Sequence, residues 1–365
     1  MLGKLGPAWY TDPDAFRREN ERIFSRLWIF AGLASLVAKP DGFFRRRIAG
    51  REIVVQNFDG AIRAYDNVCR HRGAILQMPE FGRGPLVCGY HGWRYAPDGS
   101  VETIPFEQDC YRLAPALRAG LRLREYALER VGELLFVNLD PSPRPIEAQF
   151  TPSLIESLRS ASSSFDREVL FTKYRGRFNW KLAYENLRDS LHPRFVHTRS
   201  LNLEVRFEAD PGRGDDLGAE PSLPELSFGG PEGTFLQNMS RPFHREVERW
   251  GAHDAYFNWL LYPNTHVVSP DGGFSFSIEH HTPIAAHETE VSIYYLTARK
   301  KRAYAGSAAV LWAYAQGAKR ILDEDTAIME RTQSGWEGGA TSTIQGTFEW
   351  RNRRTDAWYL RAMTE

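Results

Sequence analysis

The sequence predicts an α+β protein, because a block of short strands follows an N-terminal helix and precedes a region that mixes strands with helices. Helices are predicted where apolar side chains recur at helical spacing, and strands where short apolar runs are separated by turn dipeptides such as Asp-Gly. A chain of 365 residues, of which 42% are hydrophobic, is long enough to form two domains or one large one.

The first elements are a helix and a set of short strands. Asp12 as N-cap and Pro13 in the first turn predict a helix over residues 13–25, and residues 1–40 form an N-terminal helical segment. A β-domain follows at residues 41–145 and ends in a proline-rich stretch. Its predicted strands are residues 43–48, 51–58, 61–67, 86–88, 93–95, 101–103 and 134–137.

The remaining residues, 146–365, form a mixed domain. Helices are predicted to begin near Pro152 and to cover residues 179–197 and 307–331. Strands are predicted at residues 168–178, 255–263, 273–283 and 288–298. Residues 204–251 are rich in glycine, proline and charge and receive no assignment.

Charge and composition exclude several classes of protein. Lys plus Arg (46) equal Asp plus Glu (46), so no overall field attracts nucleic acid or an anionic membrane. No apolar run reaches the length of about 18 residues that a membrane span needs, and the first residues do not form a secretion signal. We therefore expect a cytoplasmic protein without nucleic-acid or membrane partners. Three cysteines argue against a disulfide framework and for metal-binding or buried thiols.

A first set of metal-binding residue types lies in the β-domain. The pattern is C-x-H, then sixteen residues, then C-x-x-H, formed by Cys69, His71, Cys88 and His91. Each half offers one thiolate and one imidazole from a turn, which suits a Rieske 2Fe-2S cluster with two cysteines on one iron and two histidines on the other. A disulfide between the cysteines would leave both histidines unexplained, and structural zinc sites usually have other spacings.

A second set lies in the mixed domain. On a regular helix Asp189 and His192 would share a face, whereas His192 and His197 would diverge by roughly 140°. Pro193 is expected to kink the chain at His192 and to bring His197 round to the same centre. Two histidines and one carboxylate on one side of a ferrous ion leave its other positions open for dioxygen and substrate.

The third ligand is predicted from the phase of the last long helix. An apolar stripe with alternating steps of four and three contains one carboxylate, Asp325; its members are Leu311, Ala315, Ala318, Leu322, Asp325, Met329 and Thr332. A carboxylate on a buried face is costly unless it is paired or binds a cation. Asp323 and Glu324 fall off the stripe. A buried salt bridge of Asp325 and a role of Asp323 as ligand are the alternatives.

Both sets resemble the motifs of one family. Cys69-Arg70-His71-Arg72-Gly73 and Cys88-Gly89-Tyr90-His91-Gly92-Trp93-Arg94-Tyr95, with Asp98-Gly99 behind, closely resemble the cluster-binding loops of the oxygenase (α) subunits of Rieske non-haem iron oxygenases, the aromatic-ring-hydroxylating dioxygenase family. Gly89 departs from the proline of many relatives and touches no ligand. Residues 189–197 resemble the D-x-x-H-x-x-x-x-H motif, and Glu324-Asp325 with Glu330 and Gln333 resembles the third-ligand helix.

This resemblance covers essentially the whole chain and implies a fold. It implies an all-β Rieske domain, an iron–sulfur β-sandwich, at residues 41–145. In the catalytic domain at residues 146–365 it implies an antiparallel sheet wrapped round the long C-terminal helix, the START-like helix-grip arrangement. The N-terminal segment is expected to pack with the catalytic domain.

The resemblance also implies residue roles. Cys69 and Cys88 would bind one cluster iron and His71 and His91 the other, while His192, His197 and Asp325 would hold a mononuclear Fe(II). Asp189 would link His192 to a cluster histidine of a neighbouring subunit in a head-to-tail homotrimer. Asn186 would support the iron site without binding the metal.

The implied activity is that of a terminal oxygenase. Electrons from NAD(P)H would arrive through a ferredoxin or a reductase, and O2 would be used for monohydroxylation, cis-dihydroxylation or oxidative dealkylation of a small aromatic or amine substrate. The length of the chain favours a monooxygenase or demethylase of α-chains alone, with a β subunit as the other arrangement. The alternatives are a Rieske electron carrier, which would need only the first set, and a zinc-bound structural module.

Other residues are given simpler interpretations. Cys110 is expected to be a partly buried free thiol, and at most one of His280 and His281 to line a pocket, because neighbours on a strand face opposite sides. A basic cluster is interpreted as a solvated face and an aromatic group as core. The former comprises Arg241, His244, Arg245 and Arg249, and the latter Tyr256, Phe257, Trp259 and Tyr262.

Overall fold

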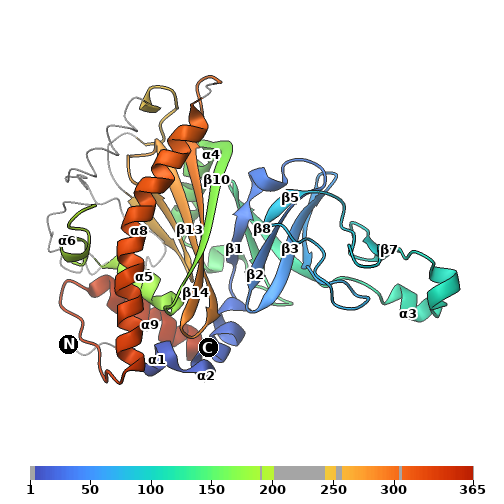
Figure 1. Cartoon of the computed structure of the whole chain (residues 1–365), viewed down its shortest axis with the longest axis horizontal. Coiled ribbons are helices and arrows are strands. Elements are labelled where there is room, and N and C mark those ends of the chain that lie inside the picture. Colours follow the sequence, from blue (N-terminus) through green and yellow to red (C-terminus); the bar gives the residue numbers. More distant parts are fainter. Residues whose placement is uncertain (1–4, 190, 201–242, 252–256, 304–305, 365) are drawn as a thin grey trace. The chain divides into compact units, whose positions relative to one another are not determined.

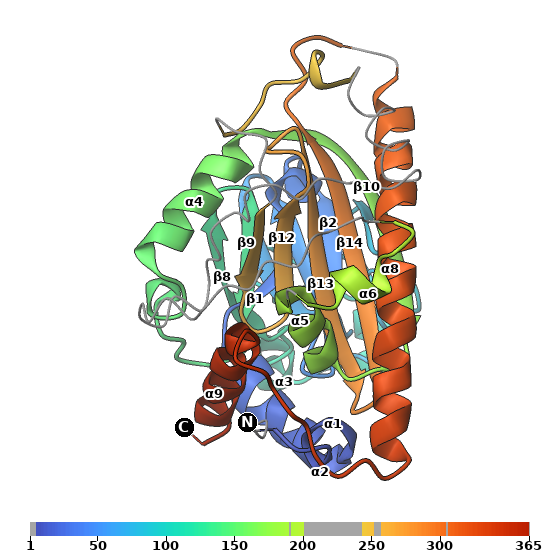
Figure 2. The same ribbon diagram turned by 90° about the vertical axis from the view of Figure 1, so that its left-hand side faces the viewer.

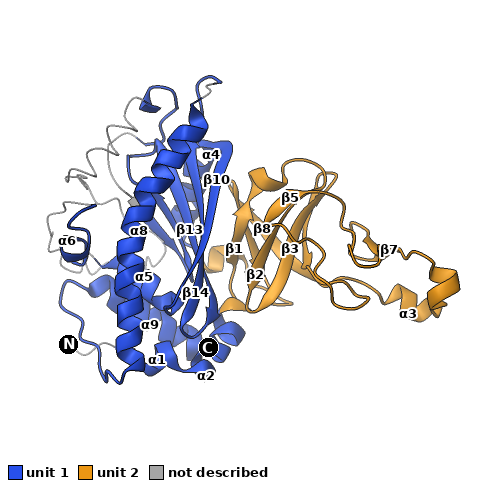
Figure 3. Cartoon of the chain, viewed as in Figure 1, with its two compact units in different colours: residues 1–23, 150–365 blue, residues 24–149 orange. Residues whose placement is uncertain are grey.

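The chain forms two compact units, each described here by itself (Figure 3). The computed structural model describes residues 5–189, 191–200, 243–251, 257–303 and 306–364. One unit is residues 24–149, and the other joins residues 1–23 to residues 150–365. The domain boundaries predicted at residues 40 and 145 differ from the limits of these two units and remain a prediction.

The unit of residues 24–149 is built on an antiparallel sheet of seven strands in the order β1-β9-β8-β4-β3-β2-β5 (Figure 1). These strands are β1 (Ile29–Leu33), β2 (Gly42–Ile48), β3 (Arg51–Phe58), β4 (Ala61–Asp66), β5 (Phe81–Arg83), β8 (Glu125–Val131) and β9 (Leu134–Asn138). A two-stranded sheet pairs β6 (Arg94–Tyr95) with β7 (Val101–Thr103). Short helices lie at Ala34–Val37, Glu107–Tyr111, Pro115–Ala119 (α3) and Ile146–Ala148.

Two tight turns fix the register of β2, β3 and β4. Ala49 and Gly50 both have positive φ, and so do Asp59 and Gly60. Two successive positive-φ residues form the turn whose twist matches that of the strands, so Ile48 pairs with Arg51 and Phe58 with Ala61. The predicted strand at residues 51–58 is therefore confirmed, as are the turns on either side of it.

The other unit is an antiparallel sheet of five strands in the order β10-β14-β13-β12-β11, with helices against it (Figures 1 and 2). The strands are β10 (Phe165–Gly176), β11 (Phe257–Leu261), β12 (Thr265–Ser269), β13 (Ser275–Ala285) and β14 (Glu288–Ala298). The helices are α1 (Ala8–Thr11), α2 (Pro13–Glu19), a π-helical turn (Asn20–Phe24), α4 (Pro152–Ser163), α5 (Trp180–Arg188), α6 (Pro193–Val196), α8 (Ser307–Glu337) and α9 (Trp350–Thr364). The predicted α+β class is confirmed.

The long helix α8 lies along one face of this sheet, over β10 and β14 (Figure 2). The hydroxyl of Tyr174 on β10 is 3.3 Å from that of Thr326 on α8, and the rings of Tyr295 and Tyr314 meet edge to face at 5.3 Å. Glu330 accepts the backbone N–H of Arg177 at 2.9 Å. These contacts fix the face of the sheet that α8 covers.

The N-terminal helices belong to the same unit because they bind α5 and α9. Glu19 at the end of α2 is fully buried and accepts hydrogen bonds from Trp180 Nε1 at 2.8 Å, Tyr359 at 2.6 Å and the Lys181 ammonium. Arg22 donates to the carbonyl of Met363 at 2.8 Å. The buried Glu19 carboxylate accepts from all three donors, Lys181 included, and these hydrogen bonds offset the free-energy cost of burying the ion pair.

Two predicted helices have different limits in the structure. The first helix was expected over residues 13–25, but α2 ends at Glu19 and one π-helical turn follows. The helix expected over residues 179–197 is interrupted, since α5 ends at Arg188 and α6 begins only at Pro193. The basis of the second difference lies in Asp189 and is described below. None of the described helices is long and apolar enough to cross a membrane.

Two candidate metal centres

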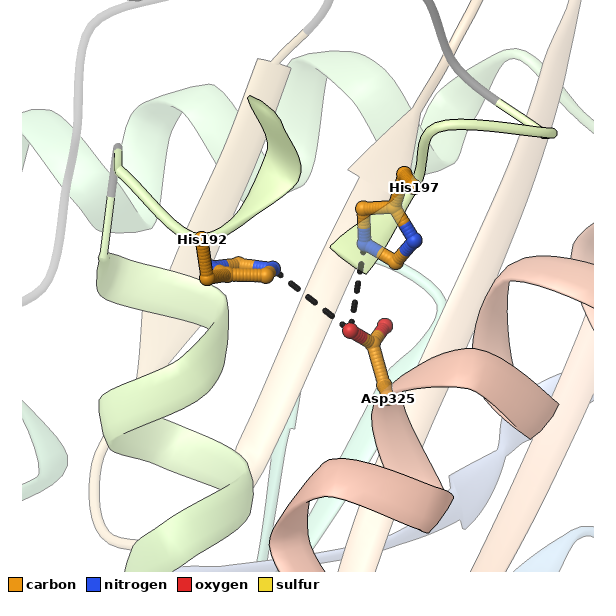
Figure 4. Close-up of side chains that lie close together, drawn as sticks. All are labelled: His192, His197 and Asp325. Atoms are coloured by element: carbon orange, nitrogen blue, oxygen red, sulfur yellow. Dashed lines mark ion pairs between the residues drawn. The ribbon is translucent and has the colours of Figure 1, made fainter. Parts of the chain in front are cut away.

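Three side chains from two parts of the chain converge beside the sheet (Figure 4). Nε2 of His197 lies 3.1 Å and Nε2 of His192 lies 3.5 Å from Oδ1 of Asp325. The nearest ligand atoms of the three residues all lie within 4.8 Å of one another, and no other such group occurs among the described histidines, cysteines and carboxylates. The histidines flank α6, and Asp325 lies in the middle of α8.

The break between α5 and α6 is what turns the two histidines toward one centre. Asp189 has extended backbone dihedrals (φ −84°, ψ 122°), and its carboxylate accepts the N–H groups of Leu191 at 2.7 Å and His192 at 3.1 Å. The Asp189 carboxylate thus closes a side-chain turn that leads out of α5. His192 itself keeps helical dihedrals, so the expected kink at Pro193 was wrong: Pro193 only begins α6.

The Nδ1 atoms of both histidines are held by oxygens that can only accept. Nδ1 of His192 is 3.0 Å from the backbone carbonyl of Asp189, and Nδ1 of His197 is 2.8 Å from the carboxylate of Glu324. Nδ1 must therefore carry the proton in each neutral ring, and the lone pair of Nε2 faces Asp325. Ser200 also donates to Glu324. Such partners fix the tautomer and the orientation of metal-binding histidines.

The electrostatics of this group favour a bound cation. Burial lowers the pKa of His192, but the neighbouring carboxylates of Asp189 and Asp325 outweigh it and, with no metal bound, raise the pKa to about 9. Burial raises the pKa of Asp325, but the two histidines outweigh it and hold that pKa far below its usual range. Oδ1 of Asp325 is buried and has no hydrogen-bond partner among the described residues. A buried anionic oxygen without a hydrogen-bond partner, beside two imidazole Nε2 atoms, fits a divalent metal ion, which would replace the proton on each ring nitrogen that faces it.

The other carboxylates of α8 lie elsewhere. Asp323 is exposed and pairs with Lys319 one turn away. Glu324 was expected to fall off the buried stripe, and sequence reasoning missed its contact with His197. Nothing in the sequence spacing signals that contact, because it joins residues 127 positions apart. Asn186 lies on α5, where its carbonyl accepts the N–H of Asp189, and its side chain makes no hydrogen bond to the described histidines or Asp325.

The first set of residues forms two loops with matching hydrogen bonds in the β-unit. The N–H of Cys69 bonds to the carbonyl of Ala74 at 2.8 Å, and the N–H of Cys88 bonds to the carbonyl of Trp93 at 2.8 Å. In each loop a glycine with positive φ (77° at Gly73, 72° at Gly92) returns its N–H to the cysteine carbonyl. A side chain at either glycine would be strained in this conformation.

The two cysteines share one buried cluster, and the two histidine rings contact each other. Cys69 and Cys88 are buried free thiols, so the structure does not contain the alternative disulfide between them. The rings of His71 and His91 meet at 4.5 Å, and His71 stacks on Trp93 at 4.8 Å. The Tyr95 hydroxyl donates to Sγ of Cys69 at 3.2 Å.

The donor atoms of these loops fit an iron–sulfur cluster. Nδ1 of His71 and Nδ1 of His91 are both buried and have no hydrogen-bond partner among the described residues. Leaving two buried imidazole nitrogens unsatisfied is costly unless a ligand occupies the space between them. Burial and the neighbouring His91 and Arg72 also lower the pKa of His71, which keeps the ring neutral for binding. Two thiols and two neutral imidazoles are the donor set of a Rieske cluster.

The remaining candidates of the sequence are placed as follows. Cys110 is exposed, so its expected partial burial was wrong. His280 and His281 are both buried on opposite faces of β13. His244 stacks on Phe274, and Arg249 donates to the carbonyl of Gly272 at 3.3 Å. Trp259 and Tyr262 are core residues as expected, whereas Arg241 and Tyr256 lie outside the described residues.

Comparison with known families matches both units. The model of the Rieske [2Fe-2S] domain matches residues 28–124, and the model of the ring hydroxylating alpha subunit (catalytic domain) matches residues 167–365. Together the two models imply a Rieske cluster and a mononuclear iron, in agreement with the donor sets described above.

Curated relatives are large oxygenase components. The large oxygenase component of salicylate 5-hydroxylase from Ralstonia sp is 29% identical over 205 residues, which are 53% of this chain and 48% of that protein. The large oxygenase component of the naphthalene 1,2-dioxygenase system from Pseudomonas aeruginosa is 27% identical over 318 residues, which are 78% of this chain and 68% of that protein. The match thus spans about half the length of the first relative.

Solved structures share the fold. A quaternary ammonium Rieske monooxygenase in complex with L-carnitine superposes with a TM-score of 0.71 at 18% identity, covering 99% of this chain and 94% of that one.

Proposed function

Because the chain belongs to the ring hydroxylating alpha subunit family and carries a Rieske [2Fe-2S] domain, we propose that it is a terminal oxygenase component that hydroxylates or oxidatively dealkylates an aromatic or amine substrate. The observation that carries the proposal is the meeting of His192, His197 and Asp325 in a chain that also has the four cluster-type donors. A Rieske electron carrier needs only the latter.

We assign the donors as follows. Cys69 and Cys88 would hold one cluster iron and His71 and His91 the other, while His192, His197 and Asp325 would hold the mononuclear iron. When bound, the cluster supplies single electrons and the iron supplies a site for dioxygen. The protein residues orient these donors: Glu324 and the carbonyl of Asp189 fix the histidine tautomers, and Tyr95 donates to the thiolate of Cys69.

Further parts of the proposal concern partners and positioning. A ferredoxin or an NAD(P)H-dependent reductase would deliver the electrons, and the chain would work as a homotrimer. Asp189 would link His192 to a cluster histidine of a neighbouring subunit, and Asn186 would support that position from the preceding helical turn. The two N–H bonds that hold the Asp189 carboxylate support a positioning role for this residue.

The test is an anaerobic metal and sulfide count, with visible and EPR spectra of the purified protein. The proposal expects about three irons and two sulfides per chain and a Rieske-type signal on reduction. Two irons with the same signal, even after reconstitution with excess ferrous iron, would instead support the electron carrier. Zinc without visible colour would contradict both functions.

A further inference from the structure

Glu279, in the middle of β13, is a buried carboxylate that the proposed chemistry does not use. Its side chain is 6% exposed. Oε1 accepts a hydrogen bond from Ser277 at 3.3 Å, and Oε2 has no partner among the described residues. Burial raises the pKa of Glu279 to about 7, so near neutral pH the unpaired carboxyl group is poised between its charged and protonated forms, and a cation at Oε2 would stabilise the charged form.

Glu279 lies on the sheet face that α8 covers. In an antiparallel sheet, directly opposed residues share a face. Tyr174 opposes Val291, which opposes His281, two positions along β13 from Glu279. Since Tyr174 reaches Thr326 on α8, Glu279 lies on the side of the sheet that faces this helix. Asp325, the neighbour of Thr326, is close enough for its charge to raise the pKa of Glu279 beyond the effect of burial.

Three tyrosines lie on the same side of the sheet as this carboxylate, two on the sheet and one on α8. Tyr295 opposes Ser277 on the same face, and its ring meets that of Tyr314 from α8. Burial is the main cause of the raised pKa values of Tyr174, Tyr295 and Tyr314, and the charge of Glu279 contributes in all three. Tyr314 and Asp325 are eleven positions apart on α8, about three turns, and so point to one side of the helix. Tyr314 therefore shares a face of α8 with Asp325, about 16 Å along the helix axis, and Tyr174 lies nearer to Asp325 through its contact with Thr326.

Among the described residues Glu279 has no positive partner within ion-pair distance, although the charge of Arg188 reaches His266 on the neighbouring strand. Glu279 forms no ion pair with a described lysine, arginine or histidine, and no metal-type cluster includes it. Burial lowers the pKa of His281 to about 4 and that of His266, the residue opposite Glu279, well below its usual value. Both rings are therefore neutral near pH 7 and cannot act as counter-ions.

We propose that Glu279, with Tyr174, Tyr295 and Tyr314, binds the alkylammonium group of the substrate, and that the substrate is a cationic amine. This inference rests on the proposed function, since it identifies the substrate of that same site. A carboxylate neutralises the charge, and aromatic faces attract a weakly hydrated alkylammonium ion. A neutral aromatic hydrocarbon has neither a net positive charge nor an N–H or O–H donor, so it could not neutralise the carboxylate of Glu279.

The test is calorimetric titration of the purified, metal-loaded protein with three probes. Choline and benzyltrimethylammonium carry the alkylammonium group, and dimethylbutanol is the uncharged carbon isostere of choline. We expect choline to bind at least about tenfold more tightly than dimethylbutanol, and benzyltrimethylammonium to bind as well. Glu279→Gln should weaken binding of the cations by about tenfold or more and leave dimethylbutanol unchanged.

Matched variants separate the charge and the rings from general damage. Glu290→Gln is the control, because Glu290 on β14 already pairs with Lys173 and Arg175. This variant should bind all three probes as the unsubstituted protein does. Tyr314→Phe keeps an aromatic ring and should retain cation binding, whereas Tyr314→Leu should lose several-fold in affinity. Visible spectra and iron content report whether each variant is folded.

Several outcomes would overturn the inference. These are equal affinity for choline and dimethylbutanol, no binding of either cation, or unchanged cation binding in Glu279→Gln. The comparison of isosteres in the unsubstituted protein stands even where a variant fails to fold. If both metals are present and no preference for charge is found, only the substrate inference fails; absence of the metals would instead contradict the proposed function.

Discussion

Three consecutive acidic residues on α8 have three different environments. Asp323 faces solvent with Lys319, Glu324 holds Nδ1 of His197, and Asp325 lies beside both Nε2 atoms. A step of one residue turns a helix by about 100°, so the phase of the helix separates a surface group from two groups at the site. The apolar stripe of the sequence was enough to predict the buried position of Asp325, which is 4% exposed.

Replacing Asp325 should remove the mononuclear iron and leave the cluster. We expect Asp325→Ala to contain about two irons per chain with an unchanged visible spectrum, because all four cluster-type donors lie in the other unit. Asp323→Ala is the matched control and should keep about three irons per chain. Iron analysis and visible absorption measure both. Loss of iron from Asp323→Ala alone would mean that the assignment of the ligand is wrong.

Replacing Glu324 should weaken the iron site without abolishing it. Glu324→Gln can no longer offer a carboxylate to Nδ1 of His197 and Ser200, so His197 loses its charged support. Partners of this kind typically contribute about 10- to 100-fold in metal affinity. Competition with a chelator at graded concentration measures the change. Identical iron retention in Glu324→Gln and in the unsubstituted protein would contradict this role.

Asp189 should matter for turnover more than for metal content. We expect Asp189→Ala to retain both metals but to lose substrate-coupled oxygen consumption, because the proposed link from His192 is removed. Asp189→Asn keeps an acceptor for the N–H groups of Leu191 and His192 and tests whether the capping contact alone suffices. Metal analysis and oxygen uptake are the measurements. Full activity of Asp189→Ala would rule out the link.

At the scale of elements, strands with clear borders were predictable. The predicted strands at residues 51–58 and 288–298 have the same limits as β3 and β14, and the last long helix begins at Ser307 as predicted. β1 and β12 were not predicted, since all five residues of each are buried and the sequence shows no alternation. α9 was also missed; its contacts with Tyr262 and Glu19 join residues far apart in the chain.

The interruption after α5 shows why the second site was only partly predictable. Local propensity suggested one helix with a kink at Pro193, and the resemblance to a family motif indicated which side chains meet. Sequence could not show that Asp189 ends α5, because its capping bonds compete with helical ones and depend on the surrounding fold. The contact of Glu324 with His197 is of the same long-range kind.

Glu185 on α5 should make stability depend on pH. Burial and the nearby charge of Asp356 raise its pKa from 4.5 to about 8, although a hydrogen bond from Tyr10 on α1 opposes the shift. A raised carboxyl pKa means that the folded state binds the proton more tightly. This contribution to stability is complete below about pH 4.5 and is lost as pH rises toward about 8.

Glu185→Gln tests this dependence. The variant has no titrating group at this position, so its free energy of unfolding should fall less between about pH 5 and about pH 8 than that of the unsubstituted protein. Urea unfolding at several pH values measures the difference. Glu21→Gln, at an exposed residue of the N-terminal segment, serves as the control. Parallel pH profiles for Glu185→Gln and the unsubstituted protein would contradict the expectation.

At the scale of the whole molecule, the chain leaves one unit after residue 23 and returns to it at residue 150. Along the chain, residues 24–149 are therefore inserted between the two parts of the unit that contains His192, His197 and Asp325. Glu19, with its three donors, and Arg22 connect the first part to α5 and α9. The N-terminal residues belong to the core of the distant part of the chain rather than to the sheet that follows them.

Removal of residues 1–23 should therefore affect the two units unequally. The truncated chain leaves Lys181 buried without its carboxylate, a type of change that typically costs about 3–5 kcal/mol. We expect a lower unfolding temperature and loss of the mononuclear iron, with the visible spectrum of the cluster retained. Calorimetry, iron analysis and absorption are the measurements. An unchanged iron content and an unchanged unfolding temperature would show that residues 1–23 are not needed for the stability of this unit.

The uninterrupted run of α8 also restricts how this protein can change over evolutionary time. Four residues make contacts in turn along this helix. Tyr314 contacts β14 and Asp325 lies beside the histidines, while Thr326 contacts β10 and Gln333 contacts the start of α5. Insertion or deletion of one residue between the first and last of these would rotate everything beyond it by about 100°. Substitutions can accumulate singly here, but changes of length must fall outside this segment.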